Sequence, residues 1–98
     1  MTVQKDPEGN EARRLHKYVD FTGKRVLEVG CGDGRLTWKY AQAARSVTAL
    51  DLDAQDLRLA SIDCPSDLRT TTAFLRADSI QLPFHKEKFD IAVLAWSL

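Results

Sequence analysis

Short, nearly continuous apolar runs alternate along the chain with segments in which apolar residues recur every three or four positions. The first pattern is typical of strands buried on both faces of a sheet, and the second of helices that pack one face on a sheet. We expect four strands, at residues 25–29, 47–50, 74–77 and 89–95. Because helical segments separate these strands, the pattern predicts βαβ units and a parallel sheet in an α/β fold.

Amphipathic segments predict three helices. The first begins at residues 6–8, where Asp-Pro-Glu is typical of a first helical turn, and ends before Gly23. A second helix follows a glycine-rich loop, and a third spans about residues 54–62, with Asp53 and Asp56 placed to cap it. The apolar faces of the first two are formed by Ala12, Leu15 and Val19, and by Leu36, Tyr40 and Ala44.

The composition is that of an ordinary globular domain. Of the 98 residues, 44% are hydrophobic and 29% are charged, and 14 Lys and Arg balance 14 Asp and Glu. Zero net charge disfavours nucleic acid as a partner. The longest apolar run, residues 91–96, is far shorter than the ~20 residues that span a bilayer, and the N-terminus lacks the apolar centre of a secretory signal. We therefore expect a cytoplasmic protein without a membrane partner.

Cysteine and histidine are too sparse to predict a metal site or a disulfide framework. Cys31 and Cys64 stand 33 positions apart with no CxxC pair, and the two histidines are His16 and His85. We expect both thiols to be reduced. The histidines are candidate bases only by default, and His85 lies in a charged His-Lys-Glu-Lys run that is typical of a protein surface.

The most informative stretch is VLEVGCGDGRL, residues 26–36, in which a strand leads into three alternate glycines and then a helix. Gly30, Gly32 and Gly34 let the backbone turn sharply and let a ligand approach where a Cβ would collide. The following helix start adds N–H groups that suit a carboxylate or phosphate. The dinucleotide pattern GxGxxG needs a glycine where this chain has Arg35, which weakens the NAD interpretation, and no GxxxxGK[ST] motif is present.

Acidic residues follow two later strands. Asp51 ends the second strand 21 residues after Gly30, where a carboxylate can accept hydrogen bonds from both hydroxyls of a ribose. Asp53 competes for this role, although we interpret it mainly as a helix cap. Asp78, with Ser79, closes the third strand, where an Asp can accept from an adenine amino group and the adjacent backbone N–H can donate to a ring nitrogen.

Together these motifs resemble those of the class I S-adenosylmethionine-dependent methyltransferases. VLEVGCGDG is similar to the family's first motif, VTALDLD to its second, and RADSIQLPFHKEKFDIAVLAWSL to its third and fourth. The resemblance covers residues 24–98 and implies a Rossmann-like parallel sheet of strand order 3-2-1-4, apparently truncated after strand 4. The chain would then comprise an N-terminal helical arm, residues 1–23, and the S-adenosylmethionine-binding half of a methyltransferase domain, residues 24–98.

The resemblance also implies which residues bind S-adenosylmethionine. They are Glu28, Gly30, Cys31, Gly32, Gly34, Asp51, Leu52, Asp78, Ser79 and Ala95. The glycine loop would line the methionine part, with Glu28 near its amino group. Asp51 would bind the ribose hydroxyls, Leu52 would pack on the adenine, and Ala95 would lie near the reactive methyl group.

The implied activity is methyl transfer to an acceptor that the sequence does not identify, with a small molecule favoured by analogy. No catalytic residue is assigned, because methyl transfer requires no protein nucleophile. A chain ending at Leu98 would leave the fourth strand as an exposed apolar edge, which predicts self-association or a partner chain there. The alternatives are a non-catalytic cofactor-binding or partner module and, less favoured, an NAD-binding Rossmann fragment.

Overall fold

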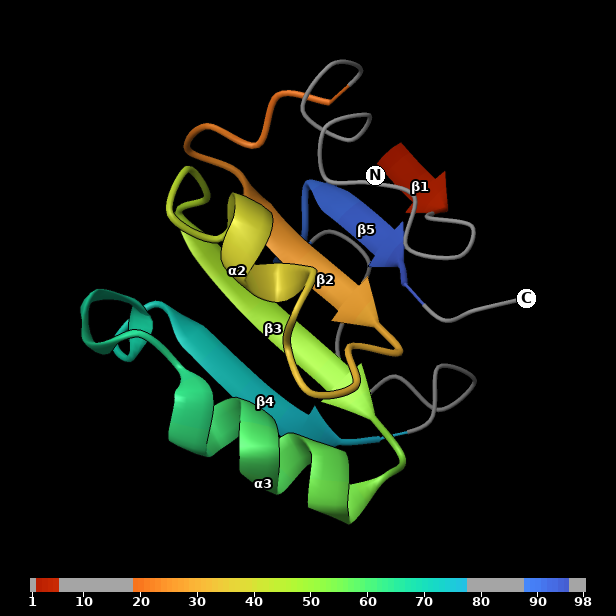
Figure 1. Cartoon of the computed structure of the whole chain (residues 1–98). Coiled ribbons are helices and arrows are strands. Elements are labelled where there is room, and N and C mark those ends of the chain that lie inside the picture. Colours follow the sequence, from red (N-terminus) through yellow and green to blue (C-terminus); the bar gives the residue numbers. More distant parts are fainter. Residues whose placement is uncertain (1, 6–18, 78–87, 96–98) are drawn as a thin grey trace.

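The computed structural model describes residues 2–5, 19–77 and 88–95, which form one parallel sheet with helices against it (Figure 1). The strands are β1 (Thr2–Lys5), β2 (Arg25–Val29), β3 (Ser46–Asp51), β4 (Thr72–Arg76) and β5 (Ile91–Leu94). Their order in the sheet is β1-β5-β2-β3-β4, and every neighbouring pair is parallel. If β2, β3, β4 and β5 are counted as strands 1 to 4, their order in the sheet is 3-2-1-4. This order confirms the predicted Rossmann-like α/β fold.

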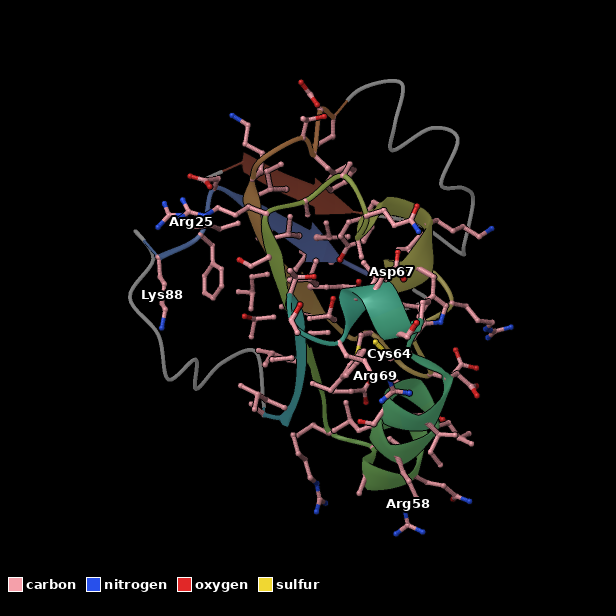
Figure 2. The ribbon with its side chains drawn as sticks, turned by 90° about the vertical axis from the view of Figure 1, so that its left-hand side faces the viewer. Arg25, Arg58, Cys64, Asp67, Arg69 and Lys88 are labelled. Atoms are coloured by element: carbon pink, nitrogen blue, oxygen red, sulfur yellow. The ribbon has the colours of Figure 1, made fainter. Side chains whose placement is uncertain are left out.

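Within residues 19–77, three short helical elements accompany the sheet. They are α2 (Thr37–Tyr40), α3 (Ala54–Asp63) and the 3₁₀ turn η2 (Ser66–Leu68). Both α2 and α3 lie on the same face of the sheet (Figures 1 and 2). Among the residues that the structure describes, no helix is long and apolar enough to cross a membrane.

The core is divided between the two faces of the sheet because side chains alternate along each strand. In β2, Val26 and Glu28 face the helices, whereas Leu27 and Val29 face the opposite side; all four are buried. The helix-side cluster is the larger of the two and includes residues of α2 and α3. This burial on both faces explains why β2 has a continuous hydrophobic pattern, and why its one acid is unusual.

The N-terminus differs from the sequence-based expectation. β1 pairs with β5, with Thr2 opposite Ile91, so the prediction that the fourth strand forms an exposed edge is wrong. The hydrophobic pattern gave no sign of β1, because an edge strand can be held by backbone hydrogen bonds without an apolar run. Most of the helix predicted from residue 6 lies outside the described residues, and residues 19–22 are not helical.

The helix predicted after the glycine loop is only one turn long. Beyond Tyr40, the amides of Ala43 and Ala44 bond to carbonyls three residues back, which tightens the chain into turns. The carbonyl of Ala43 accepts from Gly23 N, and the amide of Arg45 donates to Lys24 O. These bonds tie the segment to the start of β2, which is where the chain must return to begin β3.

The third helix matches its prediction closely. Asp53 is the N-cap of α3, and its side chain accepts from the amides of Gln55 and Asp56 at 2.9 and 3.1 Å. At the other end, the Arg69 guanidinium donates to the carbonyls of Ser61 and Ile62, each at 3.3 Å (Figure 2). Both ends of α3 therefore have side-chain partners for backbone groups that the helix itself leaves unpaired.

Candidate cofactor-binding site

The glycine loop, residues 30–34, leaves the carboxyl end of β2 and is tied at once to β3. The amides of Gly30 and Cys31 both donate to the carbonyl of Leu50, at 2.8 and 3.0 Å. Gly30, Gly32 and Gly34 have φ values of +80°, +56° and +92°, which place them in the left-handed region that favours glycine. The three predicted glycines are therefore required by the path of the backbone.

Asp51 joins the loop to the second strand. One of its carboxylate oxygens accepts from Gly32 N at 2.8 Å, and the other accepts from Asp53 N at 2.9 Å. The side chain is only partly buried. Because each carboxylate oxygen can accept more than one hydrogen bond, Asp51 keeps capacity for the hydroxyls of a ligand.

The ends of three strands meet around this contact. Leu52, directly after β3, is 59% exposed, and its carbonyl accepts from Arg76 Nε at 2.9 Å. Ala95, directly after β5, donates from its amide to the carbonyl of Val29 at 2.8 Å and is partly buried. The structure thus brings the glycine loop, Asp51, Leu52 and Ala95 to the carboxyl edge of the sheet, where open α/β sheets bind ligands.

Two of the predicted site residues, Asp78 and Ser79, lie outside the described residues. The last described residue before them is Ala77, whose amide donates to the carbonyl of Asp51 at 3.1 Å. The chain therefore reaches the same edge of the sheet immediately before this pair. His16 and His85 also lie outside the described residues.

Four acids lie at the glycine loop, and we call them the acidic rim. Asp33 belongs to the loop, and Asp51, Asp53 and Asp56 lie close by. Partial desolvation, and then the charges of Asp53, Asp51 and Asp33, raise the pKa of Asp56 above its ordinary value. A Cβ built on Gly32 would lie 4.0 Å from Asp56 Oδ2, which places that carboxylate beside the loop. Arg35 Nε pairs with Asp33 Oδ1 at 3.1 Å and so offsets one of the four acids. The other three leave the rim with excess negative charge.

Glu28 lies beneath the loop rather than at its surface. Its side chain is fully buried, and Oε1 accepts from Thr37 Oγ1 at 2.8 Å and from the Tyr40 hydroxyl. The sequence analysis did not identify Thr37 or Tyr40 as partners of this acid. An acid within a strand buried on both faces requires hydrogen-bond donors nearby. This requirement could have indicated that polar side chains of the following helix meet Glu28.

Cys31 is a buried, free thiol within the loop. Burial first, and then the charges of Glu28 and Asp51, raise the pKa of this thiol far above its ordinary value. A thiol that stays protonated is a poor nucleophile. Cys31 packs with the hydrophobic residues on the helix side of the sheet. Cys64 is also buried and free, and within the described ranges no three His, Cys, Asp or Glu side chains are grouped to hold a metal ion.

The fold and site together define a class of protein. A parallel sheet of this order, with a glycine loop after its first inner strand and an acid after the second, is that of a Rossmann-like domain. The sequence profile of the methyltransferase domain family matches residues 26–98. The chain belongs to this family, which confirms the resemblance drawn from its motifs.

Individual relatives agree with the family. The chain is 26% identical over 90 residues to the demethylmenaquinone methyltransferase of Lactococcus lactis, covering 89% of this chain and 36% of that protein. It is 37% identical over 76 residues to the ubiquinone biosynthesis O-methyltransferase of Actinobacillus pleuropneumoniae, covering 70% and 31%.

A solved structure shows the same arrangement. The crystal structure of an S-adenosylmethionine-dependent methyltransferase from Mesorhizobium loti is 28% identical and superposes with a TM-score of 0.71, over 87% of this chain and 39% of that one. The chain therefore spans about a third of the length of the relatives that it matches. The part of this chain that matches them includes the glycine loop and Asp51.

Proposed function

We propose that this chain binds S-adenosylmethionine and supplies the cofactor-binding part of a methyltransferase that acts on a small molecule. The observation that carries the proposal is the 2.8 Å hydrogen bond from Gly32 N to Asp51 Oδ2. It joins the loop suited to the methionine part of the cofactor to the acid suited to its ribose. Two motifs that lie 19 residues apart in the sequence thereby form one cradle.

Within this cradle we assign each part of the cofactor to a neighbouring group. Gly30, Cys31 and Gly32 line the methionine part, and Asp51 accepts from the ribose hydroxyls. The exposed side chain of Leu52 covers one face of the adenine. Asp78 and Ser79 bind the polar edge of the adenine, and Ala95 lies beside the reactive methyl group because the end of β5 adjoins the end of β2.

The acidic rim supports S-adenosylmethionine over NAD. S-adenosylmethionine carries a sulfonium and an ammonium against one carboxylate, whereas the pyrophosphate of NAD brings two negative charges to the same loop. Asp53 and Asp56 add negative charge beside Asp51, and this charge attracts the first ligand and repels the second. The glycine loop also leads into a helix of only four residues. The dipole of so short a helix attracts phosphate less than that of the longer helix that the sequence predicted.

When bound, S-adenosylmethionine supplies the activated methyl group, so the chain's own residues bind, orient and exclude water. We assign them no proton transfer. The names of the two curated relatives point to quinone-related acceptors, and we propose an acceptor of this small-molecule class rather than a nucleic acid or a membrane surface. The balanced charge of the chain supports this assignment, and we place the activity in the cytoplasm.

Titration calorimetry on the 98-residue chain tests the proposal. S-adenosylmethionine should bind, and NAD should bind more weakly or not at all. Replacing Asp51 with Ala should weaken S-adenosylmethionine binding by ~1–3 kcal/mol, because the ligand hydroxyls and the partly buried amide of Gly32 lose their partner. Asp63→Asn, an exposed change at the far end of α3, is the matched control and should leave the affinity unaltered. Binding of NAD alone would overturn the proposal.

A further inference from the structure

Glu28 is the one acid among the five residues of β2, and it is completely buried. Both hydroxyls that it accepts from belong to α2, where Thr37 and Tyr40 stand three positions apart and so lie on the same side of the helix. A single carboxylate oxygen thus binds both ends of α2. The contact joins the strand before the glycine loop to the helix after it.

α2 depends on such contacts. It has four residues and no side-chain cap at Leu36, and an isolated helix of that length is not stable in water. Besides the two bonds to Glu28, the Tyr40 ring stacks on Phe21 with centroids 4.5 Å apart, and the Trp38 ring meets Phe74 edge-on at 5.6 Å. Of these interactions, only the bonds to Glu28 fix α2 by directional contacts to β2.

α2 in turn holds the carboxyl side of the glycine loop. The amide of Trp38 donates to the carbonyl of Gly34 at 3.1 Å, and the Trp38 ring lies so close that a Cβ on Gly34 would be 2.5 Å from it. The amino side of the loop has separate anchors, namely the Leu50 carbonyl and the Asp51 carboxylate. A shift of α2 would therefore release one side of the loop and leave the other in place.

We propose that Glu28 is a positioning residue, which sets the shape of the glycine loop for cofactor binding through the hydroxyls of Thr37 and Tyr40. This inference rests on the proposed function. It assigns to Glu28 an action through α2, in place of a direct bond to the cofactor's amino group. Charge on Glu28 is then secondary to its capacity to accept two hydrogen bonds.

The chemistry of Tyr40 is consistent with this assignment. Burial, followed by the charge of Glu28, raises the pKa of the Tyr40 hydroxyl well above its ordinary value. The hydroxyl therefore remains protonated and donates to Glu28 throughout the range in which a cytoplasmic enzyme works. Loss of the Tyr40 proton therefore does not break the contact in this range.

Three variants separate positioning from a direct charge effect. Glu28→Leu removes the acceptor and the charge, Glu28→Gln keeps an acceptor oxygen without the charge, and the double variant Thr37→Val with Tyr40→Phe keeps the charge without the donors. Thr72→Val is the control, because the buried Thr72 hydroxyl has no hydrogen-bond partner among the described residues. Binding of S-adenosylmethionine to the full chain is measured by calorimetry, alongside binding of methylthioadenosine, which lacks the amino-acid part.

The double variant and Glu28→Leu should each weaken S-adenosylmethionine binding about tenfold or more, the usual effect of losing hydrogen bonds to a charged group. Methylthioadenosine binding should change much less. Glu28→Gln should recover most of the affinity that Glu28→Leu loses. If Glu28→Gln is as weak as Glu28→Leu while the double variant binds like the native chain, Glu28 acts by charge and the proposal is overturned.

Hydrogen exchange gives a second, ligand-free readout. In the double variant the amide of Trp38 should exchange faster relative to the amides of β2, because its bond to Gly34 depends on α2. A uniform rise across β2 and β3 would mean that the hydroxyls support the whole fold, and would also overturn the proposal. A native chain that fails to bind S-adenosylmethionine would defeat the proposed function, whereas the exchange experiment would still decide the role of Glu28.

Discussion

At the scale of single residues, this structure shows how one position can serve both the fold and the ligand. Asp51 fixes the glycine loop through Gly32 N and the start of α3 through Asp53 N, and it does so from the edge where a ribose would bind. The sequence spacing predicted that Asp51 lies near the loop. It did not predict that the carboxylate bonds to the loop itself, because this bond depends on the left-handed turn at Gly32.

Glu28 shows what a motif leaves open. The resemblance implies that it lies near the cofactor's amino group, and the structure adds that its buried carboxylate accepts from two hydroxyls. Those partners come from residues whose spacing indicated only an apolar helix face. Sequence patterns show which side of a helix is buried, but they do not show which buried polar groups will meet across a turn.

Gly34 offers a test of the loop's packing. Gly34→Ala should destabilise the chain by the ~1–2 kcal/mol of a left-handed alanine, and by a further ~1–3 kcal/mol for the overlap with Trp38. Gly23→Ala is the control, since φ there is +69° but no atom lies within 4 Å of the added Cβ. Urea unfolding monitored by circular dichroism measures both. Equal losses for the two variants would show that the Trp38 contact is unimportant.

At the scale of elements, the strands were predicted better than the helices. β2 has the predicted bounds, and β3, β4 and β5 each differ from theirs by one or two residues at each end. Burial on both faces imposes a continuous apolar pattern that is easily recognised. α2 was overestimated because its apolar spacing continues to Ala44, although backbone bonds to residues 23 and 24 end the helix at Tyr40.

The inner strands are also joined by an ion pair at the end of the sheet opposite the site. Arg25 at the start of β2 donates to Asp90, immediately before β5, from Nε and a terminal nitrogen, each at 3.1 Å, and its backbone amide donates at 2.9 Å (Figure 2). These bonds lower the pKa of Asp90 from 3.8 to about 2. Bidentate geometry makes this pair stronger than a typical surface contact.

The pH dependence of stability follows from that shift. Because the folded-state pKa of Asp90 is depressed, its contribution is fully present above pH 3.8 and is lost as the pH falls toward 2. Asp90→Asn should therefore lower the melting temperature at pH 7 and leave a smaller further loss between pH 4 and pH 2 than in the native chain. Thermal unfolding at several pH values measures this. Parallel pH profiles for the two chains would contradict the assignment.

At the scale of the whole molecule, the sheet combines strands that the sequence predicts with one strand, β1, that it does not. β2, β3 and β4 follow one another by βαβ connections, which the order of strands and helices in the sequence predicted, and β5 lies beside β2 as the resemblance implied. β1 joins the opposite edge from the far end of the chain, and its pairing with β5 links residues about as distant in sequence as this chain allows. Such a contact leaves no local pattern, so it can be found only in the structure.

The charge distribution of the molecule is uneven, and the acidic rim makes the electrostatic potential negative at the edge of the sheet where the cofactor would bind. The chain has no net charge, yet four acids gather at the loop. Desolvation, and then the charges of Asp53, Asp51 and Asp33, raise the pKa of Asp56. A cationic ligand favours the ionised form of Asp56, so affinity for S-adenosylmethionine should rise with pH through that pKa. It should also fall with added salt, because these partly exposed charges are screened over about 10 Å at 0.1 M ionic strength.

S-adenosylhomocysteine, which lacks the sulfonium charge, is the matched ligand for this test. Asp56→Asn should weaken binding of S-adenosylmethionine several-fold while changing S-adenosylhomocysteine binding little, because it removes one negative charge of the acidic rim. Asp63→Asn should affect neither ligand, because Asp63 lies at the other end of α3. Calorimetry at low and high salt compares the four combinations. Equal losses for both ligands would mean that Asp56 supports the shape of the loop, and that the sulfonium does not gain from the acidic rim.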